Sequence, residues 1–236
     1  MFDAAASHLQ LRQFTPKQVL ERQVREVTSG GESVSGFVAS VASSNPVPGG
    51  GSVAAHAGAL AAALAQMVAG LTIGKKKYAA VDAEMKEAAL KAVSLGNTLA
   101  GLVKRDAEAY SHVSEAYKLP KEPADAAARR ADAVTTALLK AAEVPLETAR
   151  ASVDVAQLAA LVAEKGNANA VTDAGVAALL AQAACKGAAY NVRVNVQSLD
   201  DRSKGAALAR EVEQLVKKVG GLAERATSAV ERSLLS

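Results

Sequence analysis

One uncharged stretch dominates the hydrophobic pattern of the sequence. Residues 53–73 contain no Lys, Arg, Asp or Glu, and three lysines follow directly after Gly74. Two prolines and the run Gly49–Gly51 precede the stretch and predict a rigid turn, after which Ser52 is expected to cap a helix. A helix that is apolar on all sides must be buried in a bundle or in lipid. Its many Ala and Gly residues, with few Leu, Ile or Phe, favour a bundle and argue against a membrane partner.

Spacings of three and four between apolar residues predict the other helices. A capping box at residues 15–18 opens one helix, and Val34, Phe37, Val38 and Val41 mark a short second one. A long amphipathic helix is expected over 81–117. Pro145 is expected to kink or restart the next one, which covers 124–143 and then 146–165. A second charge-poor helix, capped by Asn169 or Thr172, runs to about residue 198. A charged helix over about 204–234, with a weak point at the glycine pair 220–221, completes the chain.

These patterns predict an all-α fold, a bundle in which two buried, charge-poor helices are wrapped by amphipathic ones. Half of the 236 residues are hydrophobic but only 3% are aromatic, so Ala, Val and Leu must form the core. We expect an N-terminal extension, helix or arm, over residues 1–31 and one helical domain over residues 32–236.

Charge and cysteine content limit the possible partners. The formal net charge is only +3, with basic and acidic residues interspersed, so nucleic acid is not implied. One Cys and three His give no zinc-finger spacing and no internal disulfide. No long apolar run follows a basic start near Met1, so a cytoplasmic location is expected.

Asp106 is the residue whose position points most directly to chemistry. It lies three residues after Val103 and four before Tyr110, within the apolar stripe of the long helix. A carboxylate on that stripe must be paired, hydrated in a cleft or protonated. Asp106 therefore either forms a buried ion pair or hydrogen bond that fixes the register between helices, or it is a catalytic carboxylate whose pKa is raised by burial.

Other polar residues also have a structural interpretation, and most of them a functional one beside it. Asp173 opens the second charge-poor helix, where an acid complements the helix dipole. Asn191 and Asn195 share a helix face and either hold a polar heterocycle or satisfy backbone groups. The glycine turn before Ser52 is either an anion cradle or a plain turn. Lys75–Lys77 either cap a helix end or attract a polyanion such as a poly-glutamate tail.

Several blocks of the sequence, in order, resemble one family. They are the stretch from Pro46 through Gly49–Gly51 to Tyr78, then RDAEAY, LPK, EVPLE, EKGNANAVTDAGVAALL and NVRVN. Together they are similar to the C-terminal region of the formiminotransferase-cyclodeaminase family, over about residues 34–225. The resemblance implies an all-helical homodimer that acts on one-carbon derivatives of tetrahydrofolate, with no cofactor beyond that substrate and no metal. The family's catalytic aspartate matches Asp106.

The resemblance also implies a reaction and a set of binding residues. No stretch resembles a formiminotransferase domain, and stand-alone members resemble enzymes that hydrolyse 5,10-methenyltetrahydrofolate to 10-formyltetrahydrofolate. The alternative is a cyclodeaminase that releases ammonia from 5-formiminotetrahydrofolate, and a non-catalytic folate-binding protein is a third possibility. The expected substrate-binding residues are Gly49, Gly50, Gly51, Ser52, Lys75, Lys76, Lys77, Tyr78, Asp173, Asn191 and Asn195.

Overall fold

The structure, a computed structural model, describes residues 33–235, and the helix expected near residues 15–28 lies outside that range. Within it the chain is all helical. A short first unit contains α3 (Val34–Val41), whose N-cap is Ser33. The second unit, from Pro46 onward, contains α4 (Gly50–Thr72), α5 (Asp82–Lys118), α6 (Ala124–Lys165), α7 (Val171–Gln197) and α8 (Ala206–Leu234). Short 3₁₀ helices, Lys76–Val81, Ala168–Ala170 and Arg202–Gly205, connect them.

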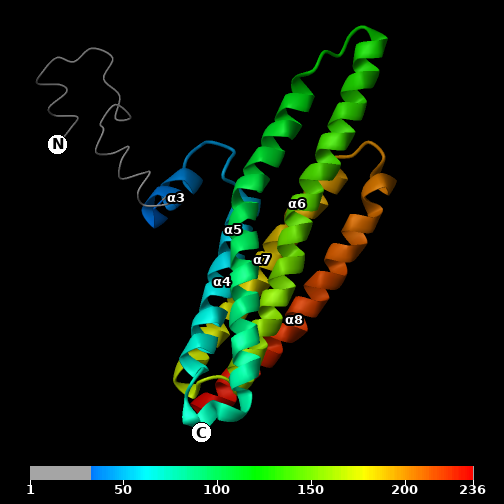
Figure 1. Cartoon of the computed structure of the whole chain (residues 1–236). Helices are drawn as coiled ribbons and strands as arrows, with labels where there is room; N and C mark the ends of the chain where they lie inside the picture. Colours follow the sequence, from blue (N-terminus) through cyan, green and yellow to red (C-terminus); the bar gives the residue numbers. More distant parts are fainter. Residues whose placement is uncertain (1–32, 236) are drawn as a thin grey trace, which may run out of the picture. The chain divides into compact units, whose positions relative to one another are not determined.

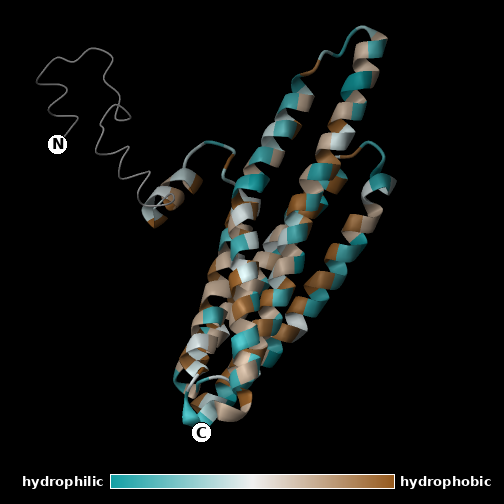
Figure 2. Cartoon of the chain, viewed as in Figure 1, coloured by the Kyte–Doolittle hydropathy of each residue, from teal (hydrophilic) through white to brown (hydrophobic). Residues whose placement is uncertain are grey.

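The five helices of the second unit form a bundle, which confirms the predicted fold class (Figure 1). Helices α4 and α7, the two charge-poor helices, pack against each other and against α6. They run antiparallel: the loop before α7 meets the C-terminal end of α4 through Asn167, whose backbone N–H donates to Thr72 Oγ1. Gly50, at the start of α4, lies instead beside Asn191, near the end of α7. The polar faces of α5, α6 and α8 recur as hydrophilic bands in Figure 2.

The core is built mainly from small residues, as the composition requires. Alanines of α4, α6 and α7 make up most of the fully buried positions, with Val, Leu and Met85 between them. Small side chains let the helix backbones approach closely. Gly58 illustrates this, because a Cβ there would lie 3.0 Å from the side chain of Leu99 on α5.

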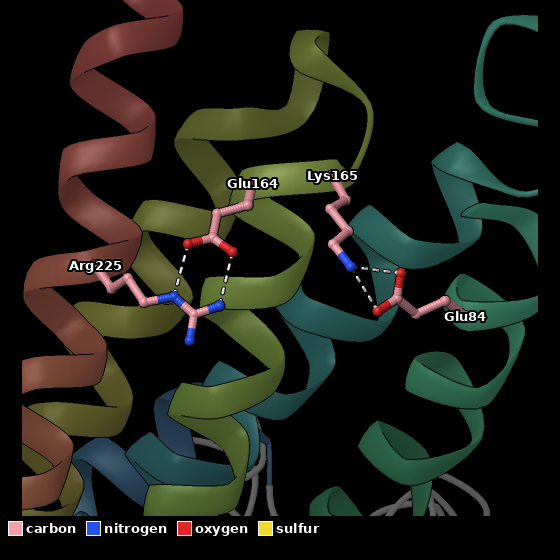
Figure 3. A network of polar contacts seen from close by, with 4 residues as sticks. All are labelled: Glu84, Glu164, Lys165 and Arg225. Atoms are coloured by element: carbon pink, nitrogen blue, oxygen red, sulfur yellow. Dashed lines mark hydrogen bonds and ion pairs between the residues drawn. The ribbon is translucent and has the colours of Figure 1, made fainter. Parts of the chain in front are cut away.

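Ion pairs join the amphipathic helices at the surface of the bundle. Figure 3 shows Lys165 of α6 bonded to Glu84 of α5 at 2.8 and 2.9 Å, and Arg225 of α8 bonded to Glu164 of α6 at 2.6 and 2.7 Å. All four side chains are partly exposed, so each pair contributes at most about 1 kcal/mol.

Two predicted helix caps are wrong, and the restart considered at Pro145 does not occur. Helix α4 starts before Ser52 and has Gly49 as its N-cap, because the glycines continue the helix instead of forming a turn outside it. Helix α7 begins at Val171 after Ala170, so neither Asn169 nor Thr172 caps it; Asn167 caps the 3₁₀ helix before it. Helix α6 runs through Pro145 without a restart, and α8 runs through its glycine pair.

One face of the α4–α7 pair carries apolar side chains that the chain itself leaves exposed. By length and hydropathy α4 could cross a membrane, and 44% of that stretch is buried inside the structure. The exposed positions recur at helical spacing, as expected for a continuous stripe. They are Val53, Leu60, Met67 and Leu71 on α4, and Val176, Leu179, Tyr190 and Val194 on α7.

Candidate active site

The Asp106 side chain points from α5 toward the first turn of α4. Ser52, which is fully buried, holds it there: its hydroxyl lies 2.9 Å from Asp106 Oδ2 and 3.1 Å from the carbonyl oxygen of Val103. The Ser52 backbone also hydrogen-bonds to the carboxylate. Ser52 therefore does not cap its own helix but positions the carboxylate of the neighbouring one.

Gly51 makes this close approach possible. A Cβ at position 51 would lie 2.6 Å from Asp106 Cγ and 2.7 Å from Oδ2, well inside the ordinary contact distance. The carboxylate thus lies against the backbone of the first helical turn, where free N–H groups and the helix dipole favour an anion. The glycine run is needed for the approach of the carboxylate rather than for a positive φ.

Burial raises the pKa of Asp106 above its ordinary value, and this effect outweighs the hydrogen bonds from the Ser52 hydroxyl and backbone, which lower it. The sequence left two alternatives, a buried hydrogen bond or ion pair that fixes register and a working carboxylate. Among residues 33–235 no ion pair joins Asp106, whereas the buried Ser52 hydroxyl does donate a hydrogen bond to it. A half-buried carboxylate with a raised pKa is suited to accept a proton during a reaction.

Asp106 lines a cleft of about 360 Å³, within the size range of small-molecule sites. The start of α4, the second half of α5, the middle of α6 and the end of α7 form its walls. Its lining includes Pro46, Val47, Gly49, Gly50, Gly51, Asp106, Ala109, Tyr110, Val113, Tyr117, Leu138, Ala141, Asn191, Val194, Asn195 and Ser198. The structure therefore brings the glycine turn, Asp106 and both asparagines to one place.

Each asparagine in the cleft donates a hydrogen bond to a backbone carbonyl. Asn191 Nδ2 donates to Gly187 O at 2.9 Å, and Asn195 Nδ2 donates to Ala141 O at 2.8 Å. The structural interpretation of both residues is therefore confirmed. Both also line the cleft, and their amide oxygens stay available there as acceptors.

The other predicted binding residues lie at the opposite end of α4. Lys75–Lys77 and Tyr78 follow its C-terminus, and Tyr78 OH accepts a hydrogen bond from the Ala168 N–H, close to Asp173 at the start of α7. The 23 residues of α4 separate the two ends by roughly 34 Å. Within one chain, the structure does not bring this group to Asp106.

Sequence reasoning missed the aromatic wall of the cleft. Tyr110 and Tyr117 were assigned to the apolar stripe of α5, yet both line the cleft and are about half exposed. Their spacing of four and eleven residues from Asp106 was the available signal, since these positions share its helix face. A tyrosine ring exposed beside a carboxylate is suited to contact a flat heterocycle.

Neighbouring polar features do not extend the site. A cleft of about 550 Å³ between α5, α6 and α8 is lined by charges of both signs, and two of them, Glu84 and Arg225, are in the ion pairs of Figure 3. Within residues 33–235 no group of three or more His, Cys, Asp and Glu side chains is arranged to bind a metal. Cys185 is buried, and burial raises the pKa of its thiol to about 11.

The described residues form an all-α bundle in which a carboxylate packs against the glycine-rich start of a neighbouring helix. Residues 33–214 match the model of the formiminotransferase-cyclodeaminase family. The chain belongs to this family, as the sequence blocks predicted.

Known relatives fall into two groups. The chain is 46% identical to the methenyltetrahydrofolate cyclohydrolase of Methylorubrum extorquens over 197 residues, which are 84% of this chain and 95% of that protein. It is 36% identical to the mouse formimidoyltransferase-cyclodeaminase over 72% of this chain, but this match spans only 31% of the mouse protein. The crystal structure of formiminotetrahydrofolate cyclodeaminase from Thermotoga maritima superposes with a TM-score of 0.78 at 32% identity, covering 86% of this chain and 97% of that one.

Proposed function

We propose that this protein hydrolyses 5,10-methenyltetrahydrofolate to 10-formyltetrahydrofolate, with Asp106 as the general base. The observation that carries the proposal is the half-buried Asp106 carboxylate, held by Ser52 in a cleft of about 360 Å³. A relative that is 46% identical over nearly its full length and is named a methenyltetrahydrofolate cyclohydrolase supports the choice of reaction.

The chemistry of hydrolysis fits a single carboxylate. The bridging carbon of the substrate is part of an amidinium-like cation, and water attacks it to give a tetrahedral carbon bonded to N5 and N10. Asp106 stabilises the cation and accepts a proton from the attacking water, an effect typically worth 10²- to 10⁴-fold. The C–N5 bond then breaks, the formyl group stays on N10, and one proton is released overall. No step of this reaction requires a metal or a redox cofactor.

The cleft offers matching contacts for the pterin. Pterin rings carry N–H and amino donors, and the cleft contains the carboxylate and the Asn191 and Asn195 amide oxygens as acceptors. Tyr110 supplies an aromatic surface on the same side of α5. We assign the pterin region to the glycine turn and these asparagines.

Two alternatives remain distinct from this proposal. Cyclodeamination of 5-formiminotetrahydrofolate is favoured by the structural likeness to the Thermotoga cyclodeaminase, and the same carboxylate could protonate departing ammonia. A non-catalytic folate-binding protein would not need a carboxylate with a raised pKa in the cleft, so Asp106 argues against it.

We further propose that two copies associate through the exposed face of α4 and α7. The exposed apolar residues of that face recur every three, four or seven residues along most of two adjacent helices. A self-complementary apolar surface of this kind is typical of two-fold dimer interfaces. Two-fold packing with the α4 helices antiparallel would bring Lys75–Lys77 and Tyr78 of one copy near the Asp106 cleft of the other. Lys75–Lys77 of one copy would then bind the glutamate tail of a substrate held in the other copy's cleft. This arrangement would explain how the lysines act although roughly 34 Å separates them from Asp106 within one chain.

The lysine proposal has a direct kinetic test. Replacing Lys75, Lys76 and Lys77 with Gln should raise KM for a polyglutamylated substrate and leave kcat nearly unchanged, and the effect should shrink in high salt. An equal rise in KM for the monoglutamate would contradict tail binding.

The choice of reaction is tested by offering the purified protein both substrates. We expect loss of the methenyl absorbance with 5,10-methenyltetrahydrofolate and little ammonia release from 5-formiminotetrahydrofolate. Faster ammonia release would favour the cyclodeaminase alternative, and no turnover of either substrate would favour the binding protein.

A further inference from the structure

The interior of α6 contains a proline at a position where a helix normally needs a backbone donor. Pro145 is buried inside the helix and has no N–H, so the hydrogen bond from residue 145 to the carbonyl of Ala141, four residues earlier, is missing. A buried carbonyl without a partner is costly. Some other donor must satisfy Ala141 O if the helix is to continue through the proline.

Asn195 of α7 supplies that donor. Its Nδ2 lies 2.8 Å from Ala141 O, and both residues line the Asp106 cleft. Because a carbonyl can only accept, this contact fixes which end of the Asn195 amide faces α6: the nitrogen. The oxygen of the same planar amide is held on the other side as an acceptor.

We propose that Pro145 is a positioning residue that acts through Asn195. Because Pro145 leaves Ala141 O without its helical donor, the Asn195 amide nitrogen bonds to that oxygen. The amide oxygen Oδ1 is then oriented to accept a hydrogen bond from an N–H or amino group of the bound substrate. The substrate is the folate of the proposed function, on which this inference rests. In most helices the Ala141 carbonyl would already be occupied, and the Asn195 amide would be free to rotate. A rotated amide would present N–H groups, which do not match a donor on the ligand.

Restoring the backbone N–H is the test. In Pro145→Ala the residue 145 N–H can bond to Ala141 O again, so it competes with Asn195 and weakens the hold on its amide. We expect the dissociation constant for 5-formyltetrahydrofolate, a stable folate that needs no turnover, to rise about two- to tenfold, the effect of one hydrogen bond. KM for the substrate should rise similarly while kcat stays within about threefold. Pro145→Val restores the same N–H with less loss of buried volume, and should behave alike if alanine leaves a destabilising cavity.

A double-mutant cycle isolates the route of the effect. If Pro145 acts only through Asn195, then Pro145→Ala should change the affinity of Asn195→Ala by less than about twofold. Pro120→Ala, a proline change in the exposed connection between α5 and α6, is the matched control and should leave affinity unchanged.

The outcomes separate this inference from the proposed function. Unchanged affinity in both Pro145 variants, or additive effects in the cycle, would overturn the role assigned to Pro145. Failure of the unmodified protein to bind any tetrahydrofolate would instead overturn the proposed function.

Discussion

The close approach of Gly51 to Asp106 makes one substitution especially informative. In Gly51→Ala the new Cβ would lie 2.6 Å from Asp106 Cγ, whereas carbon atoms in contact are normally about 3.5–4.0 Å apart. The carboxylate must therefore move by about 1 Å, or rotate away, and its 2.9 Å hydrogen bond with Ser52 must lengthen or break. A displacement of this size in a reacting group costs on the order of a hundredfold in rate.

Stability should change much less than activity. Overpacking typically costs about 1–3 kcal/mol, while replacing glycine by alanine inside a helix recovers about 0.5–1 kcal/mol. The net loss of up to about 2.5 kcal/mol leaves the protein folded at assay temperature. We expect kcat to fall about a hundredfold with an intact helical circular-dichroism spectrum.

Gly101→Ala is the matched control, because a Cβ at this exposed position of α5 meets no atom within 4 Å. It should keep full activity and gain slightly in stability. A Gly51→Ala variant that stays within about threefold of the unmodified kcat would refute the idea that this carboxylate position matters.

Three further predictions test other parts of the account. If the proposed dimer forms through α4 and α7, Leu179→Glu should give monomers by light scattering and lower activity, whereas Leu90→Glu, at an exposed leucine on α5, should do neither. Burial raises the pKa of Asp106, so folding favours the protonated carboxyl group. The stability that this proton contributes is fully present below the ordinary pKa of 3.8 and is lost as pH rises through the folded-state pKa. In thermal melts at increasing pH, Asp106→Asn should not show this loss of stability. Cys185, with a thiol pKa of about 11, should resist alkylation at pH 8 until the chain unfolds.

The helical character of residues 33–235 followed from the sequence because it rests on periodicity. The stripe of α5 and the scarcity of charge in α4 and α7 predicted the bundle, and the same stripe found Asp106. A carboxylate at a position that should be apolar is a local signal that needs no tertiary information.

The features that were missed depend on contacts between distant residues. Ser52 looked like an N-cap because capping is a local preference, yet its partner is Asp106, 54 residues away. Pro145 was expected to kink or restart its helix, because the compensating Asn195 is on another helix. The distance between Lys75–Lys77 and Asp106 could not be deduced either, since it depends on Asp106 of α5 lying beside the first turn of α4.

The central claim is that Asp106 is the base that hydrolyses the methenyl bridge, and Asp106→Asn tests it most directly. This change keeps the size of the side chain but removes the charge and the base, and Glu115→Gln on an exposed part of α5 is its control. One preparation of each should be measured by single-turnover loss of methenyl absorbance and by thermal melting. We predict at least a hundredfold slower turnover for Asp106→Asn, with a melting temperature that is level or higher because a half-buried charge has been removed. A variant destabilised by about 3–5 kcal/mol that still hydrolyses the substrate at the normal rate would contradict the claim.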